Sequence, residues 1–490
     1  MKAWKYIVGA SCAVALFCTQ GAYGASSEME ILLKKLQEKG ILTKEEAAEI
    51  AAETKKAAEE EKAEVKETAA QTAAETVEAK EAEAKAATEA GGETKQAGGI
   101  PDWLPDWIRN TKFNGDLRLR YEARDREDDG RGTQGRGRFR LRAGLTTEIT
   151  DDIEVGFSLA SGTGDQRSAN QTLGGAFDRK DIWIDTAYAR YTPAPWFSIV
   201  GGKFVNPIWQ PSDMLFWSDL NPEGAAMRLE GPVASNFALF FNSAFYVVED
   251  RNAGGTGSSA SFPSAPGGAP DPLMYVLQPG FKWDLTKDTF LRFAPAYYVT
   301  SNFRGELAIN PTNDPLIPGA PANSFSGTNT LTKSGKYAYN YSVIDWGAEL
   351  GFNKPFGVSW IPYFGIMAGF SDNPSPSKNN DTYLVGFSVG NTDVVKRGEW
   401  AFEYTFRRIE KDAWLDFLTD PSFYKGATNA MGHRARLLLG LAKNTALGLN
   451  FYDTWQVRNF SPVSSLTIPG STRTLSSEEY LGQVDIYFRF

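Results

Sequence analysis

Cysteine and histidine are almost absent from this chain of 490 residues. Its two cysteines, Cys12 and Cys18, lie within the first 24 residues, and its single histidine is His433. A disulfide framework downstream of residue 24 is therefore excluded. One histidine cannot supply a His/Cys metal cluster, nor a Ser–His pair with any backup. The sequence therefore predicts no enzyme activity, no catalytic residues, no cofactor and no metal site.

An excess of positive charge is also missing, since the formal net charge is −9. Residues 25–110 carry 12 Lys and Arg against 20 Asp and Glu, whereas residues 111–490 carry 37 against 40. A nucleic-acid partner therefore has no support. The letters of residues 130–135 fit G-x-G-x-x-G, but they precede a candidate strand rather than a helix, so the dinucleotide-binding interpretation fails.

No long apolar run is present either, even at the N-terminus. Lys2 and Lys5 precede a short apolar core, residues 7–17, and Ala22-Tyr23-Gly24 has the small-x-small form of a cleavage site. The core is too short to span a bilayer. Residues 1–24 are therefore predicted to be a secretory signal peptide.

Residues 25–100 are predicted to form a helical arm with a linker. Residues 28–50 have the pattern of a helical hairpin, and Thr43 to Glu46 has capping-box spacing. From Ala47 to Ala90 the chain is almost entirely Ala, Glu, Lys and Thr, without Pro or Gly. Possible heptad seams contain mainly Ala, which favours a solvated or partly disordered helix over a coiled coil. Both interpretations remain open.

From residue 111 the composition changes to that of a β protein. Sixteen candidate strands begin near residues 113, 136, 153, 180, 196, 222, 236, 273, 288, 339, 357, 381, 399, 432, 445 and 478. Short turns alternate with long loops rich in Gly, Ser, Pro and Asn. This alternation is typical of a transmembrane antiparallel up-and-down β-barrel. We therefore predict an all-β barrel of about 16 strands over residues 111–490, preceded by a periplasmic α-helical arm.

Single strands show two unlike faces. In residues 399–407 four aromatic side chains lie opposite Glu399, Glu403 and Arg407, and in residues 433–441 an apolar face lies opposite Arg434 and Arg436. Periodicity alone cannot tell a soluble barrel from a membrane barrel, in which the polar face lines the lumen. The signal peptide, the alternation of loops and the stretch Tyr480–Phe490, with an aromatic residue at its end, favour the membrane. Phe490 is therefore predicted to act as an assembly signal.

The chain resembles the putative porin family of Gram-negative outer-membrane channels. The resemblance rests on residues 32–47 after the signal peptide, 113–122 at the start of the barrel, 201–204 and 221–224. It implies an outer-membrane diffusion porin in a Gram-negative bacterium, with the arm in the periplasm, and a homotrimer. These motifs are structural signatures and do not identify a solute.

A group of arginines forms the strongest cluster of candidate site residues. The predicted pore-lining basic residues are Arg118, Arg120, Arg136, Arg138, Arg140, Arg142, Arg434, Arg436 and Arg489, and the predicted pore-lining acidic residues are Asp345, Glu349, Glu399 and Glu403. Opposed rows of this kind would place a transverse field across a water-filled pore. The alternative is that the arginines pair with Asp116, Glu122, Glu148 and Glu154 and only stiffen the wall.

The segment from Asn206 to Pro222 is the second candidate site. By strand counting it is the third external loop, and its Pro, Asp and aromatic content is unlike that of a floppy loop. We predict an inward constriction loop with Trp209, Asp213, Phe216, Trp217 and Asp219 as its key residues. The alternative is a rim loop at a subunit interface.

The sequence therefore predicts passive ion and solute transport through a diffusion channel in the outer membrane. Its expected partners are outer-membrane lipid, small hydrophilic solutes and, through the arm, the cell wall. A competing hypothesis is a structural anchor that tethers the outer membrane to the cell wall through the arm. Deleting the arm would separate the two functions.

Overall fold

The structure is a computed structural model that describes residues 109–126, 133–213, 215–250, 270–306, 309, 329–332, 336–355, 357–458 and 478–490. The predicted signal peptide, helical arm and linker lie outside the described residues. No helix among the described residues is long and apolar enough to cross a bilayer.

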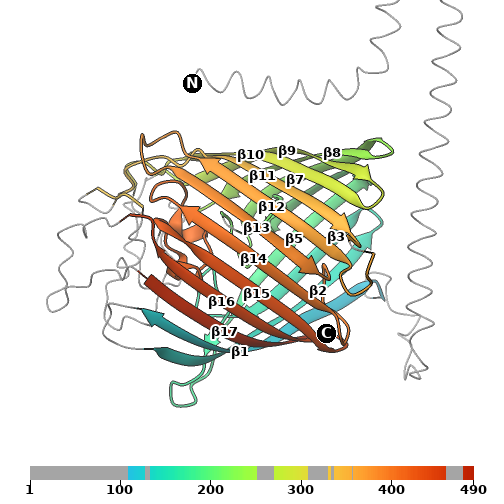
Figure 1. Ribbon diagram of the computed structural model, residues 1–490. Helices are drawn as coiled ribbons and strands as arrows, with labels where there is room; N and C mark the ends of the chain where they lie inside the picture. The colour runs from blue at the N-terminus through green and yellow to red at the C-terminus, as the bar shows by residue number, and fades with distance from the viewer. Residues whose placement is uncertain are drawn as a thin grey trace, which may run out of the picture. The chain divides into compact units, whose positions relative to one another are not determined.

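The described chain is built almost entirely of antiparallel strands (Figure 1). They are β1 Thr111–Arg126, β2 Gln134–Thr150, β3 Ile153–Ser161, β4 Gln171–Thr172, β5 Ile182–Ala194, β6 Phe197–Lys203, β7 Glu223–Ala234, β8 Phe237–Val247, β9 Leu273–Thr286, β10 Thr289–Ser301, β11 Ile344–Asn353, β12 Tyr363–Asp372, β13 Asp381–Gly390, β14 Trp400–Ile409, β15 Ala430–Ala442, β16 Thr445–Gln456 and β17 Glu478–Arg489. Two short 3-10 helices, Asp416–Leu418 and Tyr424–Gly426, lie between β14 and β15.

The sheet closes on itself. Each long strand pairs with the next along the chain, and β17 pairs with β1 through eleven residue pairs that run from Asp116–Arg489 to Arg126–Glu479. The two-residue β4 only extends the edge of β2 beyond the end of β3. Without β4 the barrel has sixteen strands, so the predicted all-β barrel and its strand number are confirmed.

Short and long connections lie at opposite ends of the barrel, which we call the short-turn end and the long-loop end (Figure 1). Five connections at the short-turn end are two residues long: 151–152, 195–196, 235–236, 287–288 and 443–444. Both ends of the barrel chain, Thr111 and Arg489, also lie there, because the strand number is even. The predicted alternation is therefore present.

Strand β17 shows how the two faces divide. Leu481, Gln483 and Asp485 are buried in the barrel interior, whereas Tyr480, Val484 and Ile486 are exposed on the outside. The outer face is a band of apolar side chains, which a bilayer would cover. The inner face is polar along part of the wall and apolar along the rest.

Two strands begin later than predicted. The strand expected near residue 339 begins at Ile344, and the one expected near residue 357 begins at Tyr363. In the first case Tyr341 and Val343 are fully buried in an apolar cluster before the regular ladder starts. In the second, Gly357 has a left-handed φ of +67° and Pro362 has no N–H to donate to a ladder.

The seam between β17 and β1 is fixed by Phe490. Its backbone N–H and C=O pair with Gly115 at 3.0 and 2.8 Å, and its ring stacks on Phe113 with centroids 6.3 Å apart. A Cβ on residue 115 would lie 2.5 Å from this ring. Glycine at this position therefore makes room for the aromatic side chain.

Replacing Phe490 with aspartate should lower the yield of assembled barrel. The change removes the aromatic pair, which contributes about 0.5–1.5 kcal/mol beyond its buried area, and places a charge on the outer, apolar face. The assembled fraction can be measured on gels as the heat-modifiable band, with Phe490→Tyr as the matched control. Wild-type levels of the aspartate variant would contradict the assembly role of Phe490.

Candidate functional site

The arginines of β1 and β2 lie side by side on the inner wall. The register places Arg118 opposite Arg140 and Arg120 opposite Arg138, while Asp116 faces Arg142 and Glu122 faces Arg136. Like charges directly opposite one another on a sheet are unfavourable. Carboxylates from several elements must therefore compensate this cluster.

Four carboxylates do so. Asp485 of β17 accepts two hydrogen bonds from Arg120, at 2.6 and 2.7 Å, and Glu122 accepts one from Arg136 at 2.5 Å. Asp116 is shared by Arg140 at 2.8 Å and Arg142 at 2.6 Å. The same two arginines also lie 3.2 and 3.3 Å from Asp219. The wall is thus partly an ion-pair network. This agrees with the alternative hypothesis, in which the arginines pair with carboxylates such as Asp116 and Glu122.

We call the arginines of β1 and β2 that line the lumen (Arg118, Arg120, Arg136, Arg138, Arg140 and Arg142) the arginine wall. Glu148 and Glu154, the other two carboxylates that the sequence offered as partners, do not reach it. Glu148 pairs with Lys112 at 3.1 Å, with both side chains exposed, and Glu154 pairs with Arg190 at 2.8 Å. Asp485 was not predicted to pair with the arginines, because its partner Arg120 lies 365 residues away in the sequence. Only closure of the barrel brings the two together.

The connection between β6 and β7 crosses the lumen and is attached at three places. The backbone N–H and C=O of Trp209 bond the side chain of Gln278 at 2.8 and 2.6 Å. Asp213 bonds Arg434 of β15 at 2.6 Å, and Asp219 contacts the arginines of β2. We call residues 206–222 the inward loop; of these, only Met214 is not described.

Asp213 is the centre of a buried charge network. Arg434, 1% exposed, lies 2.6 Å from Asp213, 2.7 Å from Glu403 and 3.5 Å from Asp420, and Arg407 lies 3.5 and 3.6 Å from the two aspartates. Burial alone would raise the pKa of Asp213, but the guanidiniums of Arg434 and Arg407 outweigh it and hold that pKa well below its usual value. Burial, together with the charge of Asp213, raises the pKa of Asp420.

Asp219 holds the other side of the inward loop. Burial opposes ionisation of this carboxyl as well, and the nearby Arg140 and Arg142 outweigh it, so that its pKa is lowered. Two carboxylates of one loop are thus ionised against two separate groups of wall arginines. These contacts connect β2 to β14 and β15 across the barrel interior.

A second loop, residues 410–429 between β14 and β15, packs against the inward loop. The indole N–H of the fully buried Trp414 donates to the carbonyl of Leu215 at 2.5 Å, and the N–H of Trp217 donates to the carbonyl of Leu418 at 2.8 Å. This loop was not predicted from the sequence as part of the site. The available signal was its apolar residues, Trp414, Leu415, Phe417 and Leu418, which would be unusual in a solvated connection.

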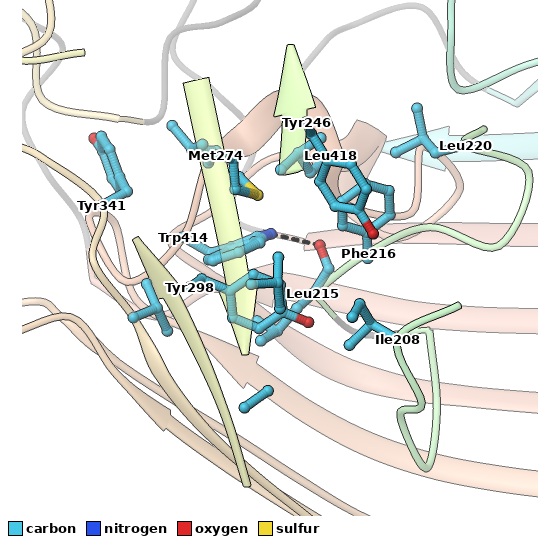
Figure 2. Close-up of a cluster of buried hydrophobic side chains, with 14 of the residues drawn as sticks. Ile208, Leu215, Phe216, Leu220, Tyr246, Met274, Tyr298, Tyr341, Trp414 and Leu418 are labelled. Carbon is cyan, nitrogen blue, oxygen red and sulfur yellow. Dashed lines mark hydrogen bonds between the residues drawn. The ribbon is translucent and has the colours of Figure 1, made fainter. Parts of the chain in front are cut away.

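The two loops help to build an apolar cluster inside the barrel (Figure 2). Figure 2 shows Trp414 beside Tyr298 and Leu215, with Met274 of β9 close to the indole. The rings of Trp414 and Tyr298 meet edge to face at 4.8 Å. Phe216, Tyr246 and Leu418 belong to the same cluster. The interior along β8–β10 is therefore filled with side chains, whereas polar side chains line β1, β2 and β14–β17.

The predicted residues of the inward loop occupy different surroundings. Phe216 is buried in the apolar cluster and contacts Tyr246, with ring centroids 6.1 Å apart. Trp217 packs on the edge of that cluster and donates its indole N–H to the carbonyl of Arg167 at 3.0 Å. The ring of Trp209 lies 4.5 Å from the guanidinium of Arg292. These contacts attach the loop to the inner wall and to the apolar cluster.

The predicted acidic residues do not form one wall. Glu403 pairs with Arg434, Glu349 accepts a hydrogen bond from Tyr363 at 2.6 Å, and Asp345 is buried, 7% exposed, on β11. Glu399 was wrongly placed on a strand. It precedes β14 in the turn at residues 391–399, where its carboxylate accepts the N–H groups of Val395 and Lys396, both at 2.8 Å.

Two of the predicted basic residues also differ from the rest. Arg489 lies at the short-turn end and pairs with Asp393 at 2.7 Å, with both side chains exposed. Arg436 is partly buried on β15 and faces the same side as Arg434. The structure therefore brings together the arginines of β1 and β2 with Arg436, whereas Arg434 belongs to the buried network and Arg489 to the rim.

His433 lies on the outer face of β15 within an aromatic group. Its ring is 5.1 Å from that of Phe406 and 5.5 Å from that of Trp455, and its Nδ1 is 2.7 Å from the hydroxyl of Tyr404. Among the described residues, no group of three or more His, Cys, Asp or Glu side chains could hold a metal ion.

Beside the arginine wall the lumen contains an open cavity of about 130 Å³. On the same measure a single water needs roughly 10–15 Å³, so the cavity has room for a hydrated solute. Its walls come from β1, β2, β15, β16 and β17, from both loops described above and from the connection between β3 and β5. We call it the basic cavity.

Comparison with known proteins agrees with this architecture. The family model described as "Putative porin" matches residues 127–324 and 350–468, more than half of the chain. The chain belongs to the putative porin family. The closed sixteen-stranded barrel with an apolar outer band is accordingly a porin-type outer-membrane β-barrel, and its family and fold are those of a channel rather than an enzyme.

Comparison with solved structures returns other proteins at low similarity. A high-pH structure of Pseudomonas putida OprB has 11% identity and a TM-score of 0.47, over 78% of this chain and 95% of that one. A triple mutant of the Rhodopseudomonas blastica porin has 10% identity and a TM-score of 0.38, over 78% of this chain and all of that one. Among curated proteins no sequence matches this porin significantly.

Replacing Trp414 with alanine should loosen the two lumen loops while leaving the barrel intact. A buried Trp→Ala change costs about 3–5 kcal/mol, and here the loss falls on contacts between loops. We expect faster proteolysis within residues 206–222 and noisier currents, with unchanged heat-modifiability. Trp196→Ala, at an exposed position, is the control. Proteolysis rates equal to wild type would contradict the role of Trp414 in holding the loops.

Proposed function

We propose that this porin is a water-filled channel for passive diffusion of small hydrophilic solutes and ions. The observation that carries the proposal is the division of the lumen. The β8–β10 side is filled by the apolar cluster, whereas the arginine wall and the basic cavity on the other side offer a polar path. Solutes would pass along β1, β2 and β15–β17, beside the inward loop.

The arginine wall would produce the electric field that acts on solutes along this path. Arg118, Arg120 and Arg138 keep their charge at any working pH, and the field of such charges extends over a Debye length of about 8 Å at physiological salt. The inward loop, with Trp209, Asp213, Phe216, Trp217 and Asp219, would act as the constriction. Passage would then depend on solute size and on charge.

Single-channel recording in planar bilayers tests the proposal. The purified protein should produce discrete steps of conductance, and liposomes that contain it should swell in small sugars faster than in large ones. Absence of both, with the protein folded and inserted, would contradict the proposed function. A solute preference beyond size and charge is not needed for this test.

The arm and the assembly state extend the proposal. We infer a homotrimer in the outer membrane with residues 25–100 in the periplasm, as the sequence resemblance implies. Chemical cross-linking in outer membranes tests the trimer. Deleting the arm tests the cell-wall tether, because an anchor predicts envelope defects with conductance intact.

A further inference from the structure

Cationic side chains outnumber carboxylates in the lining of the basic cavity. Its lining includes eight cationic side chains: Arg118, Arg120, Arg124, Arg136, Arg138, Arg167, Lys425 and Arg436. Three carboxylates, Glu122, Asp165 and Asp219, line it as well. Two more pair with it from the wall, since Asp485 bonds Arg120 and Glu479 bonds Arg124 at 2.8 Å. The described residues therefore leave an excess of cations around the cavity.

Three of these guanidiniums are poorly neutralised. Arg118 is 7% exposed, donates to Asn170 at 2.7 Å, and its Nε finds no acceptor. Arg138 has only Glu122 at 3.5 Å, which is already bonded to Arg136 at 2.5 Å, and its Nε also finds no acceptor. Arg436 makes no hydrogen bond with any part of the chain that the structure describes, and Glu403, the carboxylate opposite it on the ladder, is already bonded to Arg434 at 2.7 Å.

The surroundings of the cavity add neutral groups that can donate to an anion. Ser168 and Thr172 of the β3–β5 connection and Asn450 and Tyr452 of β16 line it, whereas the hydroxyl of Tyr487 already donates to Asp485 at 2.8 Å. Row by row, the ladders place Glu122, Gln483, Asn450 and Arg436 on neighbouring strands at one level of the wall. The cavity is thus a concave surface in which donors outnumber acceptors.

We propose that the basic cavity is a saturable binding site for small dianionic oxyanions, which carry phosphate or paired carboxylate oxygens. The inference rests on the proposed channel function and assigns a preferred class of solute to it. Guanidiniums from β1, β2 and β15 would contact oxygens at opposite sides of one small solute. A planar guanidinium fork fits carboxylate and phosphate oxygens with two parallel hydrogen bonds.

The distribution of the cations selects a dianion over chloride. A single-charged ion can satisfy one guanidinium, whereas the unmatched charges here lie on strands separated by β16 and β17. A small solute with charge at both ends, or with several oxygens, can satisfy more than one of them. Restoring acceptors to buried donors is favourable because an unsatisfied buried group is costly.

Isothermal titration calorimetry of the full, detergent-solubilised protein in dilute salt tests the site. Inorganic phosphate at mildly alkaline pH and succinate are the two probes, and acetate at matched ionic strength is the monoanion control. We expect at least one dianion to bind saturably and more tightly than acetate. Binding of phosphate alone, or of succinate alone, would support the site and identify which oxyanion it takes.

Variants locate the site. Arg436→Gln should weaken dianion binding about tenfold or more, as expected for loss of a charge-assisted hydrogen bond. Because Arg436 makes no hydrogen bond among the described residues, and Glu403 opposite it is also held by Arg434, this change should leave the barrel folded. Arg118→Gln should act in the same direction. Arg190→Gln, which changes an arginine paired with Glu154 outside the cavity, should leave binding unchanged.

Three results would contradict the proposed binding site. Binding that is linear in concentration, no tighter for dianions than for acetate, or unchanged in Arg436→Gln would overturn the proposal. Single-channel recording separates the two claims. Currents without dianion binding would remove this inference and leave the channel in place, whereas binding without currents would remove the channel function and leave the site.

Discussion

Replacing Asp213 with alanine is expected to release the inward loop and raise the single-channel conductance severalfold. The carboxylate lies between Arg434 and Arg407, both 1% exposed in their side chains. Removing one partner of a buried ion pair costs about 3–5 kcal/mol, because it leaves a buried charge without compensation. Asp420 and Glu403 remain, but neither belongs to the inward loop. The loss therefore falls on the attachment of the loop to the wall.

The matched control is Asp178→Ala, which removes an ion pair with Lys180. The Asp178 side chain is 53% exposed, so this pair contributes little to stability. The control variant should leave conductance unchanged. Asp213→Asn keeps the shape of the side chain and should give an intermediate effect. An Asp213→Ala channel with wild-type conductance would show that the loop stays in place without this ion pair.

The attachment through Asp213 should resist mild acid. Its pKa is lowered in the folded state, so its contribution is present above the ordinary aspartate value of about 3.9 and is lost only as the pH falls through the lowered pKa. Asp420, whose pKa is raised, accepts a proton first. Conductance measured from neutral pH down to about 4 should therefore stay constant. A severalfold rise within that window would contradict the assigned charge state of Asp213.

Replacing Arg138, Arg140 and Arg142 together with glutamine is expected to shift ion selectivity from anions toward cations. Asp116 and Asp219 would then lose the guanidinium partners that neutralise them. In a tenfold salt gradient a fully selective pore would reach about 59 mV for a single charge, and we expect the reversal potential to cross zero. The difference should fade at high salt, since the Debye length falls from about 30 Å at 0.01 M to about 3 Å at 1 M.

The structure modifies one part of this expectation. The sequence indicated arginines that line a water-filled pore, but Arg140 and Arg142 hold both Asp116 and Asp219. The triple variant should therefore also loosen the inward loop. Arg138→Gln alone leaves these contacts in place and should shift selectivity less, without that loosening. Arg190→Gln is the control for the loss of a positive charge elsewhere. If the triple variant keeps the parent's reversal potential, these arginines stabilise the wall but do not set ion selectivity.

The strands could be predicted from the sequence because the alternation of polar and apolar residues along one strand distinguishes its inner face from its outer face. In β15 the alternation of Arg434 and Arg436 with apolar neighbours identifies the inner face without any knowledge of its partners. Two-residue turns such as 443–444 then limit the pairing. Errors fell at strand ends, as with Glu399, where period-two reasoning continues one residue beyond the ladder.

The lumen was less predictable because its contacts join distant parts of the chain. The Pro, Asp and aromatic residues of the inward loop indicated an ordered segment, but not that Asp213 would meet Arg434 across 221 residues. Asp420 and Trp414 were missed for the same reason. Periodicity assigns a residue to a face, whereas the partner across a closed barrel depends on strand order and shear.

The central claim, a water path through the basic cavity, can be tested most directly by thiol modification during single-channel recording. Both native cysteines precede residue 25, so in a protein expressed from residue 25 onward a cysteine at Thr163, an exposed residue of the cavity lining, would be the single thiol. A charged, membrane-impermeant thiol reagent should then lower the current in a lasting step, and the same reagent should not affect Leu449→Cys on the outer face. Unchanged current after complete modification at residue 163 would contradict the account, because ions would then pass elsewhere or not at all.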